Sequence, residues 1–137
     1  MKIILKFILV LALIFSGYNM SAQTISSFNP EKFRFALSEE ENPQIIDVRT
    51  KAEFDAGHIK DAINIDINKI DFQKKVVKKL QKDRIVYVYC RTGIRSLRAA
   101  KILSNLDFIR IYNLEGGLEA WEKHGYPTKK KNNKGNL

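Results

Sequence analysis

The residues best suited to a chemical reaction lie in the stretch Cys90-Arg91-Thr92-Gly93-Ile94-Arg95-Ser96, which contains the only cysteine of the chain. A thiolate is a strong nucleophile, and nearby cations or a helix N-terminus lower the pKa of a thiol. Arg91 and Arg95 supply cations, and Gly93 allows a tight curl of the backbone. A lone cysteine is more often a buried small hydrophobic residue. The two arginines and the glycine favour a reactive Cys90 instead.

The segments on either side of this stretch predict how it is held. Residues 84–89 are rich in β-branched and aromatic side chains, which is typical of a buried strand. Residues 96–106 predict a helix whose apolar face consists of Ala99, Ile102, Leu103 and Leu106. Cys90 is therefore expected where a strand ends and a helix begins, the place where open α/β sheets bind ligands. The free amides of the loop and helix N-terminus are expected to stabilise a thiolate or a bound oxyanion.

The stretch 90–96 resembles the active-site loop of rhodanese-type sulfurtransferases. Residues 45–49, 53–64 and 113–121 are similar to further blocks of that family, in the same order, so that the resemblance covers about residues 40–127. It implies a three-layer α/β/α fold around a central, mostly parallel five-stranded sheet. It also implies a reaction in which Cys90 accepts a sulfane sulfur as a persulfide and passes it to an acceptor nucleophile.

The loop residues have expected roles in that reaction. Arg91 and Arg95 are expected to bind an anionic donor, with Arg95 alternatively holding the loop in place. The other loop residues are expected to contribute mainly their backbone amides: Thr92, Gly93, Ile94 and Ser96.

Residues upstream of the loop are expected to support it. Thr50 and Glu53 match a capping box for a short helix that would end at Gly57 as a left-handed cap. The resemblance implies that Arg49 and Glu53 form a structural ion pair, and that Asp47 braces the active-site loop.

His58 is a further candidate for a supporting role. A Cys–His pair is conceivable, but the resemblance implies that His58 packs and forms hydrogen bonds, and a thiolate needs no general base. His58 and His124 are the only histidines, so a histidine metal site is not expected. No cofactor is expected either.

Two other function classes compete with sulfur transfer. Cysteine phosphatases and arsenate reductases need five residues between the cysteine and the arginine, whereas only four separate Cys90 from Arg95. The shorter loop suits a single sulfur atom better than a tetrahedral phosphate. The second alternative is a persulfide carrier or partner-binding module without turnover, and the presence of Cys90, Arg91 and Arg95 argues against an inactive domain.

The length of 137 residues, with 45% hydrophobic and 28% charged residues, predicts that the chain forms one globular domain. We expect a signal peptide at 1–22, an N-terminal extension with a first helix at 23–39, a rhodanese-like domain at 40–128 and a basic disordered tail at 129–137. A short edge strand is expected at 24–26, and a helix is expected to begin at Asn29-Pro30. Residues 69–82 predict a helix with these side chains inward: Ile70, Val76, Val77 and Leu80.

The first 22 residues combine Lys2 and Lys6 with an apolar run from Phe7 to Phe15 and small residues up to Ala22, which is typical of a signal peptide. Export to the periplasm or the medium is expected, without stable membrane insertion after cleavage; an uncleaved N-terminal anchor is the alternative. Loss of both lysines lowers the formal net charge from +9 to +7. Despite this charge, an exported chain is not expected to bind nucleic acid.

The expected partners follow from the resemblance. The donor would be a small anionic sulfur compound such as thiosulfate, a polysulfide or a persulfide, which the positive charge would attract. The acceptor would be cyanide, a thiol or a thioredoxin-like protein. With a single cysteine no intrachain disulfide is possible, and a monomer is expected.

Overall fold

The computed structural model describes residues 1–4 and 22–130. Most of the expected signal peptide (5–21) and tail (131–137) lies outside the described residues. The strands are β1 (Thr24–Phe28), β2 (Gln44–Asp47), β3 (Ile63–Asn64), β4 (Ile85–Tyr89) and β5 (Arg110–Leu114). The helices are α2 (Pro30–Ser38), α3 (Lys51–Ala56), α4 (Phe72–Lys79), α5 (Ile94–Asn105) and α6 (Gly117–Lys123).

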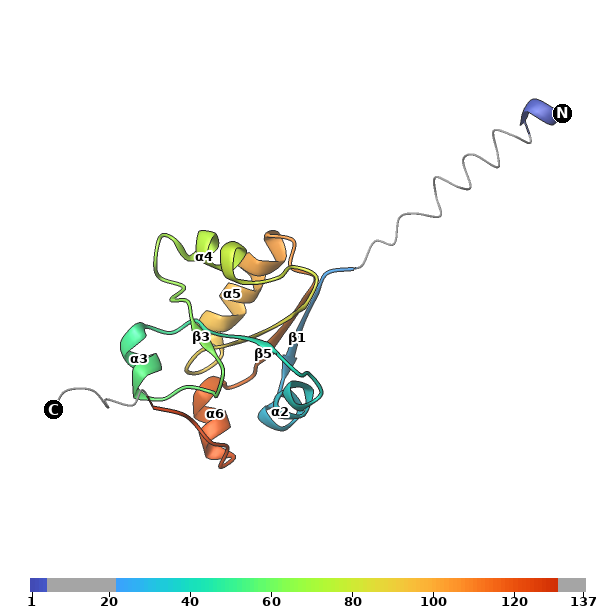
Figure 1. Ribbon diagram of the computed structural model, residues 1–137. Coiled ribbons are helices and arrows are strands. Elements are labelled where there is room, and N and C mark those ends of the chain that lie inside the picture. Colours follow the sequence, from blue (N-terminus) through green and yellow to red (C-terminus); the bar gives the residue numbers. More distant parts are fainter. Residues whose placement is uncertain (5–21, 131–137) are drawn as a thin grey trace.

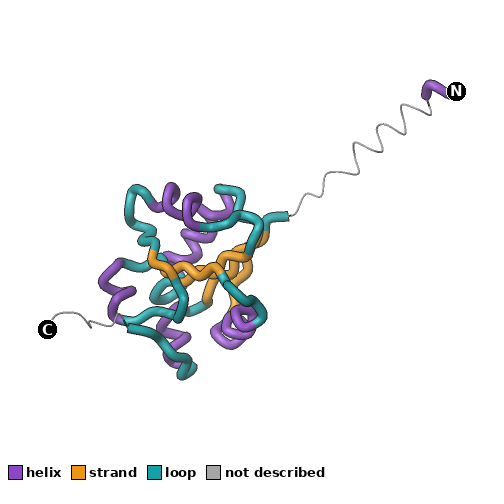
Figure 2. The backbone as a smooth tube through the Cα atoms, viewed as in Figure 1, coloured by secondary structure: helices purple, strands orange, loops and turns teal. Residues whose placement is uncertain are grey.

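The strands form one five-stranded sheet in the order β1-β5-β4-β2-β3, and every neighbouring pair is parallel. The sheet is the middle layer of three, with α4 and α5 on one side and α2 and α6 on the other (Figures 1 and 2). Parallel strands need crossover connections, which the helices between them provide. The expected α/β/α fold with a parallel sheet is confirmed.

The central strand β4 shows why the sheet is buried on both faces. Val86 and Val88 belong to the core shared with α4 and α5, whereas Tyr87 and Tyr89 belong to the core shared with α2 and α6. Successive side chains of a strand point to opposite faces, so this run of five apolar or aromatic residues fills both cores. The double burial fixes the end of β4, and thereby the start of the Cys90 loop.

Two local expectations are confirmed at the edge of the sheet. Residues 24–28 form an edge strand, longer than the expected 24–26, and pair with β5. The Asn29 side chain caps α2 by accepting a hydrogen bond from the Lys32 amide at 2.9 Å, with Pro30 in the first turn.

Two other local expectations are wrong. The helix expected over 69–82 is only Phe72–Lys79, so Ile70 precedes it and is fully exposed, while Phe72 takes the inward position. Val77 is also exposed, because Val76 occupies the inward face of this short helix. Gly57 follows α3 with φ of 164°, which is extended rather than left-handed backbone.

Candidate active site

Cys90 lies in the loop between β4 and α5 and is almost completely buried, with 1% of its surface exposed. Its Sγ accepts a hydrogen bond from the Gly93 amide at 3.1 Å. Gly93 caps α5 in the left-handed conformation, with φ of +98°, and a Cβ there would lie 3.3 Å from the Gly116 amide nitrogen. Glycine is therefore the residue that permits this curl, as the sequence predicts.

A second donor to the sulfur is the Ser96 hydroxyl, which lies 3.3 Å from Cys90 Sγ and is fully buried. Burial of the thiol opposes ionisation, but hydrogen bonds from the Ser96 hydroxyl and from the amides of Ser96, Gly93 and Thr92 outweigh it. The pKa of Cys90 is lowered as a result. The sequence predicts the amides of Thr92, Gly93 and Ser96 but misses the Ser96 side chain, whose direction depends on the curl of the loop.

We expect Ser96→Ala to raise the pKa of Cys90, because one donor to the thiolate is lost. Alkylation of Cys90 by iodoacetamide at neutral pH should slow by about three- to tenfold, the value of one modest hydrogen bond. The pH profile of alkylation should move to higher pH. Ser104→Ala, near the other end of α5, removes a hydroxyl away from the sulfur and should leave the profile unchanged. An unshifted profile for Ser96→Ala would contradict this role.

The Arg95 guanidinium is paired with a carboxylate, and its expected role in anion binding stays a prediction. It donates to both carboxylate oxygens of Glu53, at 2.9 and 2.8 Å. Glu53 also accepts from the amide and hydroxyl of Thr50, at 3.0 and 2.9 Å, in the expected capping box. The alternative expectation, that Arg95 holds the loop, fits this geometry, because the pair ties the first turn of α5 to the start of α3.

The hydrogen bond from Arg95, aided by those from Thr50 and opposed by burial, lowers the pKa of Glu53 to about 2. A lowered pKa in the folded state means that the ionised carboxylate stabilises the fold above its ordinary pKa of 4.5 and loses this effect as the pH falls toward 2.

We therefore expect Glu53→Gln to lower the free energy of unfolding at pH 7 by about 1–2 kcal/mol, allowing for partial solvent screening. The difference in the free energy of unfolding between wild type and variant should become smaller as the pH falls from about 4.5 to 2. Urea unfolding at several pH values measures this. Asp71→Asn, in the exposed pair with Lys75, is the matched control and should have little effect at any pH. A gap that stays constant with pH would contradict the prediction.

Asp47 and Arg49 form a buried ion pair of their own. Arg49 Nη2 lies 2.7 Å from Asp47 Oδ2, and the same nitrogen donates to the Gly57 carbonyl at 2.6 Å. The ion pair expected between Arg49 and Glu53 is therefore wrong, because each takes another partner. A buried carboxylate such as that of Asp47 requires a close cation, and Arg49, two residues away, supplies it.

Arg91 lies on the surface of the loop, with 65% of its side chain exposed. Its Nε donates to Glu119 Oε1 at 2.8 Å. The start of α6 also binds the loop backbone: the Leu118 amide donates to the Cys90 carbonyl at 2.8 Å and the Glu119 amide to the Arg91 carbonyl at 3.1 Å. The sequence misses the role of Glu119, since a surface glutamate carries no distinguishing pattern.

His58 packs against Phe54. Its ring stacks on Phe54 at 3.8 Å between centroids, and its Nδ1 lies 2.9 Å from the Phe54 carbonyl oxygen. These contacts suit the expected packing role. Over residues 1–4 and 22–130, no group of three or more His, Cys, Asp or Glu is arranged to hold a metal ion, and no helix is long and apolar enough to cross a membrane.

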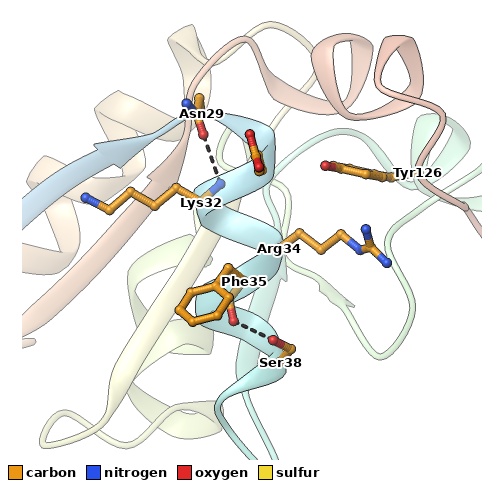
Figure 3. Close-up of a pocket in the computed structure, with 7 residues that line it drawn as sticks. Asn29, Lys32, Arg34, Phe35, Ser38 and Tyr126 are labelled. Atoms are coloured by element: carbon orange, nitrogen blue, oxygen red, sulfur yellow. Dashed lines mark hydrogen bonds between the residues drawn. The ribbon is translucent and has the colours of Figure 1, made fainter.

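A cavity of about 560 Å³ lies along α2, apart from the Cys90 loop. Figure 3 shows Arg34 reaching from this helix toward Tyr126, while Phe35 and Ser38 lie further along it. The guanidinium of Arg34 lies 4.6 Å from the centre of the Tyr126 ring. Cys90 does not line this cavity, so thiol chemistry is expected at the loop and not along α2.

Comparison with known proteins agrees with this arrangement. A model of the rhodanese-like domain matches residues 30–124, which begins ahead of residue 40, the start expected for this domain. A sulfurtransferase of Allochromatium vinosum is 34% identical over 103 residues, which cover 75% of this chain and 94% of that protein.

Two solved structures have the same fold. The rhodanese-like domain of an Anabaena protein superposes with a TM-score of 0.69 and 26% identity, covering 81% of this chain and 84% of the other. The polysulfide-sulfur transferase homodimer of Wolinella succinogenes superposes with a TM-score of 0.65 and 27% identity, covering 82% of this chain and 83% of the other. The sulfurtransferases among these relatives support sulfur transfer as the general chemistry. Because the match at 30–124 covers more than half of the chain and includes the whole Cys90 loop and strands β2 to β5, the chain belongs to the rhodanese-like domain family.

Proposed function

We propose that the protein is a sulfurtransferase in which Cys90 carries the transferred sulfur as a persulfide. The observation that supports this most is the buried Cys90 sulfur, which accepts hydrogen bonds from the Gly93 amide and the Ser96 hydroxyl. These donors stabilise a thiolate before the reaction and a persulfide anion after it.

The reaction has two displacement steps. The Cys90 thiolate attacks the outer, sulfane sulfur of the donor, a new S–S bond forms, and the donor's S–S bond breaks. The electron pair leaves with the rest of the donor, which is sulfite for thiosulfate or a thiolate for a persulfide. In the second step an acceptor nucleophile attacks the outer sulfur of the Cys90 persulfide and restores the thiolate, so cyanide becomes thiocyanate.

Phosphate transfer is less well supported than sulfur transfer. The Arg95 guanidinium is held by both oxygens of Glu53, so it is not directed at a phosphate above Cys90. The loop is also one residue shorter than a phosphate-binding cysteine loop requires. An aryl phosphate should therefore not be hydrolysed.

A protein acceptor is supported by the surface beside the loop. Ile94 and Leu97, in the first turn of α5, are 78% and 39% exposed. Exposed apolar side chains next to a reactive group are common at protein-binding sites. A thioredoxin-like thiol protein is the acceptor we propose, and a carrier without turnover on small molecules is the second candidate function.

Export remains a proposal from the first 22 residues. Expression of the full chain in a bacterium, followed by fractionation and a mass measurement, should give a periplasmic product that begins at Gln23. A product of full mass in the membrane fraction would favour an uncleaved anchor.

Steady-state kinetics test the proposed enzyme. Thiosulfate, polysulfide and an alkyl persulfide serve as donors, with cyanide or a thiol as acceptor. A covalent Cys90 intermediate predicts ping-pong kinetics, with parallel double-reciprocal lines. Intersecting lines would contradict a free persulfide intermediate. Sulfur loading without turnover on any small acceptor would favour the carrier.

A further inference from the structure

On the side of the loop that faces α3 and α6, the guanidinium groups are paired with carboxylates. Arg49 pairs with Asp47 at 2.7 Å, Arg91 with Glu119 at 2.8 Å and Arg95 with Glu53 at 2.8 Å. A guanidinium paired in this way has fewer free N–H groups and less net charge to offer an anion.

A cavity of about 370 Å³ lies on the Arg91 side of the loop, and three carboxylates and two guanidinium groups line it: Glu53, Glu119, Glu122, Arg49 and Arg91. Among these carboxylates, Glu119 is the one paired with Arg91, the guanidinium that belongs to the loop. A dianion near Arg91 therefore meets a positive charge that Glu119 already offsets, and each extra negative charge on the donor adds a cost.

The Arg91–Glu119 pair differs from the other two. The side chains of the Arg49–Asp47 pair are buried and those of the Arg95–Glu53 pair are half-buried. The side chains of Arg91 and Glu119, in contrast, are 65% and 55% exposed. The Glu119 amide donates to the Arg91 carbonyl at 3.1 Å, so the fold itself holds Glu119 against the residue that follows Cys90. Such an exposed pair contributes little to stability, which leaves room for a role in selectivity.

We infer that Glu119 is a specificity-determining residue: by pairing with Arg91, it disfavours the thiosulfate dianion as a donor relative to persulfides of low charge. The inference rests on the proposed sulfur transfer and names its substrate class. With a persulfide R–S–SH, the Cys90 thiolate attacks the outer sulfur, the S–S bond breaks, and R–S⁻ leaves with the electron pair. This step brings no second negative charge past Glu119.

The test compares two donors in the full protein: thiosulfate and the freshly prepared persulfide of 2-mercaptoethanol, whose alkyl part is uncharged. The quantity measured is the ratio of kcat/KM for thiosulfate to kcat/KM for the persulfide. Glu119→Gln should raise this ratio about tenfold, the size expected for one unit of charge near a partly exposed site. The gain should lie mainly in KM for thiosulfate and should shrink with added salt.

Two further variants identify the cause. Glu122→Gln removes the same charge from the same helix but leaves Arg91 paired, so its ratio should change much less than that of Glu119→Gln. In the double variant Arg91→Gln/Glu119→Gln the gain should disappear, because it depends on a freed guanidinium.

Three results would overturn the inference. An unchanged ratio in Glu119→Gln would mean that donors do not sense this pair. An equal rise in Glu122→Gln, or a rise that survives loss of Arg91, would point to the general field of the cavity. If the wild type transfers sulfur from neither donor, the proposed function itself fails, which is a separate outcome.

Discussion

Replacing Cys90 by serine should abolish sulfur transfer while the protein still folds. An alcohol of ordinary acidity is a far weaker nucleophile than a thiolate and cannot form a persulfide, so kcat/KM should fall by at least about a thousandfold. Because Cys90 is the only cysteine, no other thiol can replace it. The serine hydroxyl can keep the hydrogen bonds from Gly93 and Ser96, which preserves the loop.

Transfer rates with a persulfide donor and urea unfolding of the same preparation measure this prediction. Cys90→Ala serves as the control for any activity of the new hydroxyl, and both variants should be equally inactive. Substantial turnover in either one would mean that sulfur passes directly from donor to acceptor without residing on Cys90.

Gly117→Ala should damage the active site although residue 117 bears no reactive group. A Cβ at this position would lie 2.5 Å from the carbonyl carbon and oxygen of Arg91 and 2.6 Å from the Cys90 carbonyl oxygen. These are backbone atoms of the loop, so relief requires the loop itself to move. Gly117 also has φ of +61°, a conformation that costs an L-residue about 1–2 kcal/mol.

The combined strain should lower the free energy of unfolding by about 2–5 kcal/mol. Activity should fall about a hundredfold, because a shift of about 1 Å misplaces the amides around the sulfur. Gly125→Ala is the matched control: its φ is +75°, and nothing lies within 4 Å of its Cβ position. Gly125→Ala should lower the free energy of unfolding through backbone strain alone, and the variant should retain its activity. Equal activity in the two variants would refute a direct contact between α6 and the loop.

The sequence predicts the framework of the site because that framework is local. The apolar run that ends at Tyr89 and the amphipathic segment after Ser96 place Cys90 between a strand and a helix. Gly93 and the Thr50–Glu53 capping box are likewise short-range features, and both are found as predicted.

The sequence does not predict the ion pairs of Arg95 and Arg91, because each joins residues far apart in the chain. Arg95 meets Glu53 across 42 positions and Arg91 meets Glu119 across 28. Only the fold decides which carboxylate reaches which guanidinium, so the implied Arg49–Glu53 pair is wrong, and Glu53 instead binds Arg95. The predicted inward side of α4 is wrong for a different reason. The helix begins at Phe72, three residues after the expected start at 69, so Phe72 is buried and Ile70 is exposed.

The most direct test of a persulfide at Cys90 is intact-protein mass spectrometry after incubation with thiosulfate, polysulfide or an alkyl persulfide. We predict a gain of one sulfur atom, located on Cys90, that is lost when cyanide is added and is absent in Cys90→Ser. No gain from any of the three donors, in protein whose Cys90 is still readily alkylated, would contradict sulfur transfer through this residue.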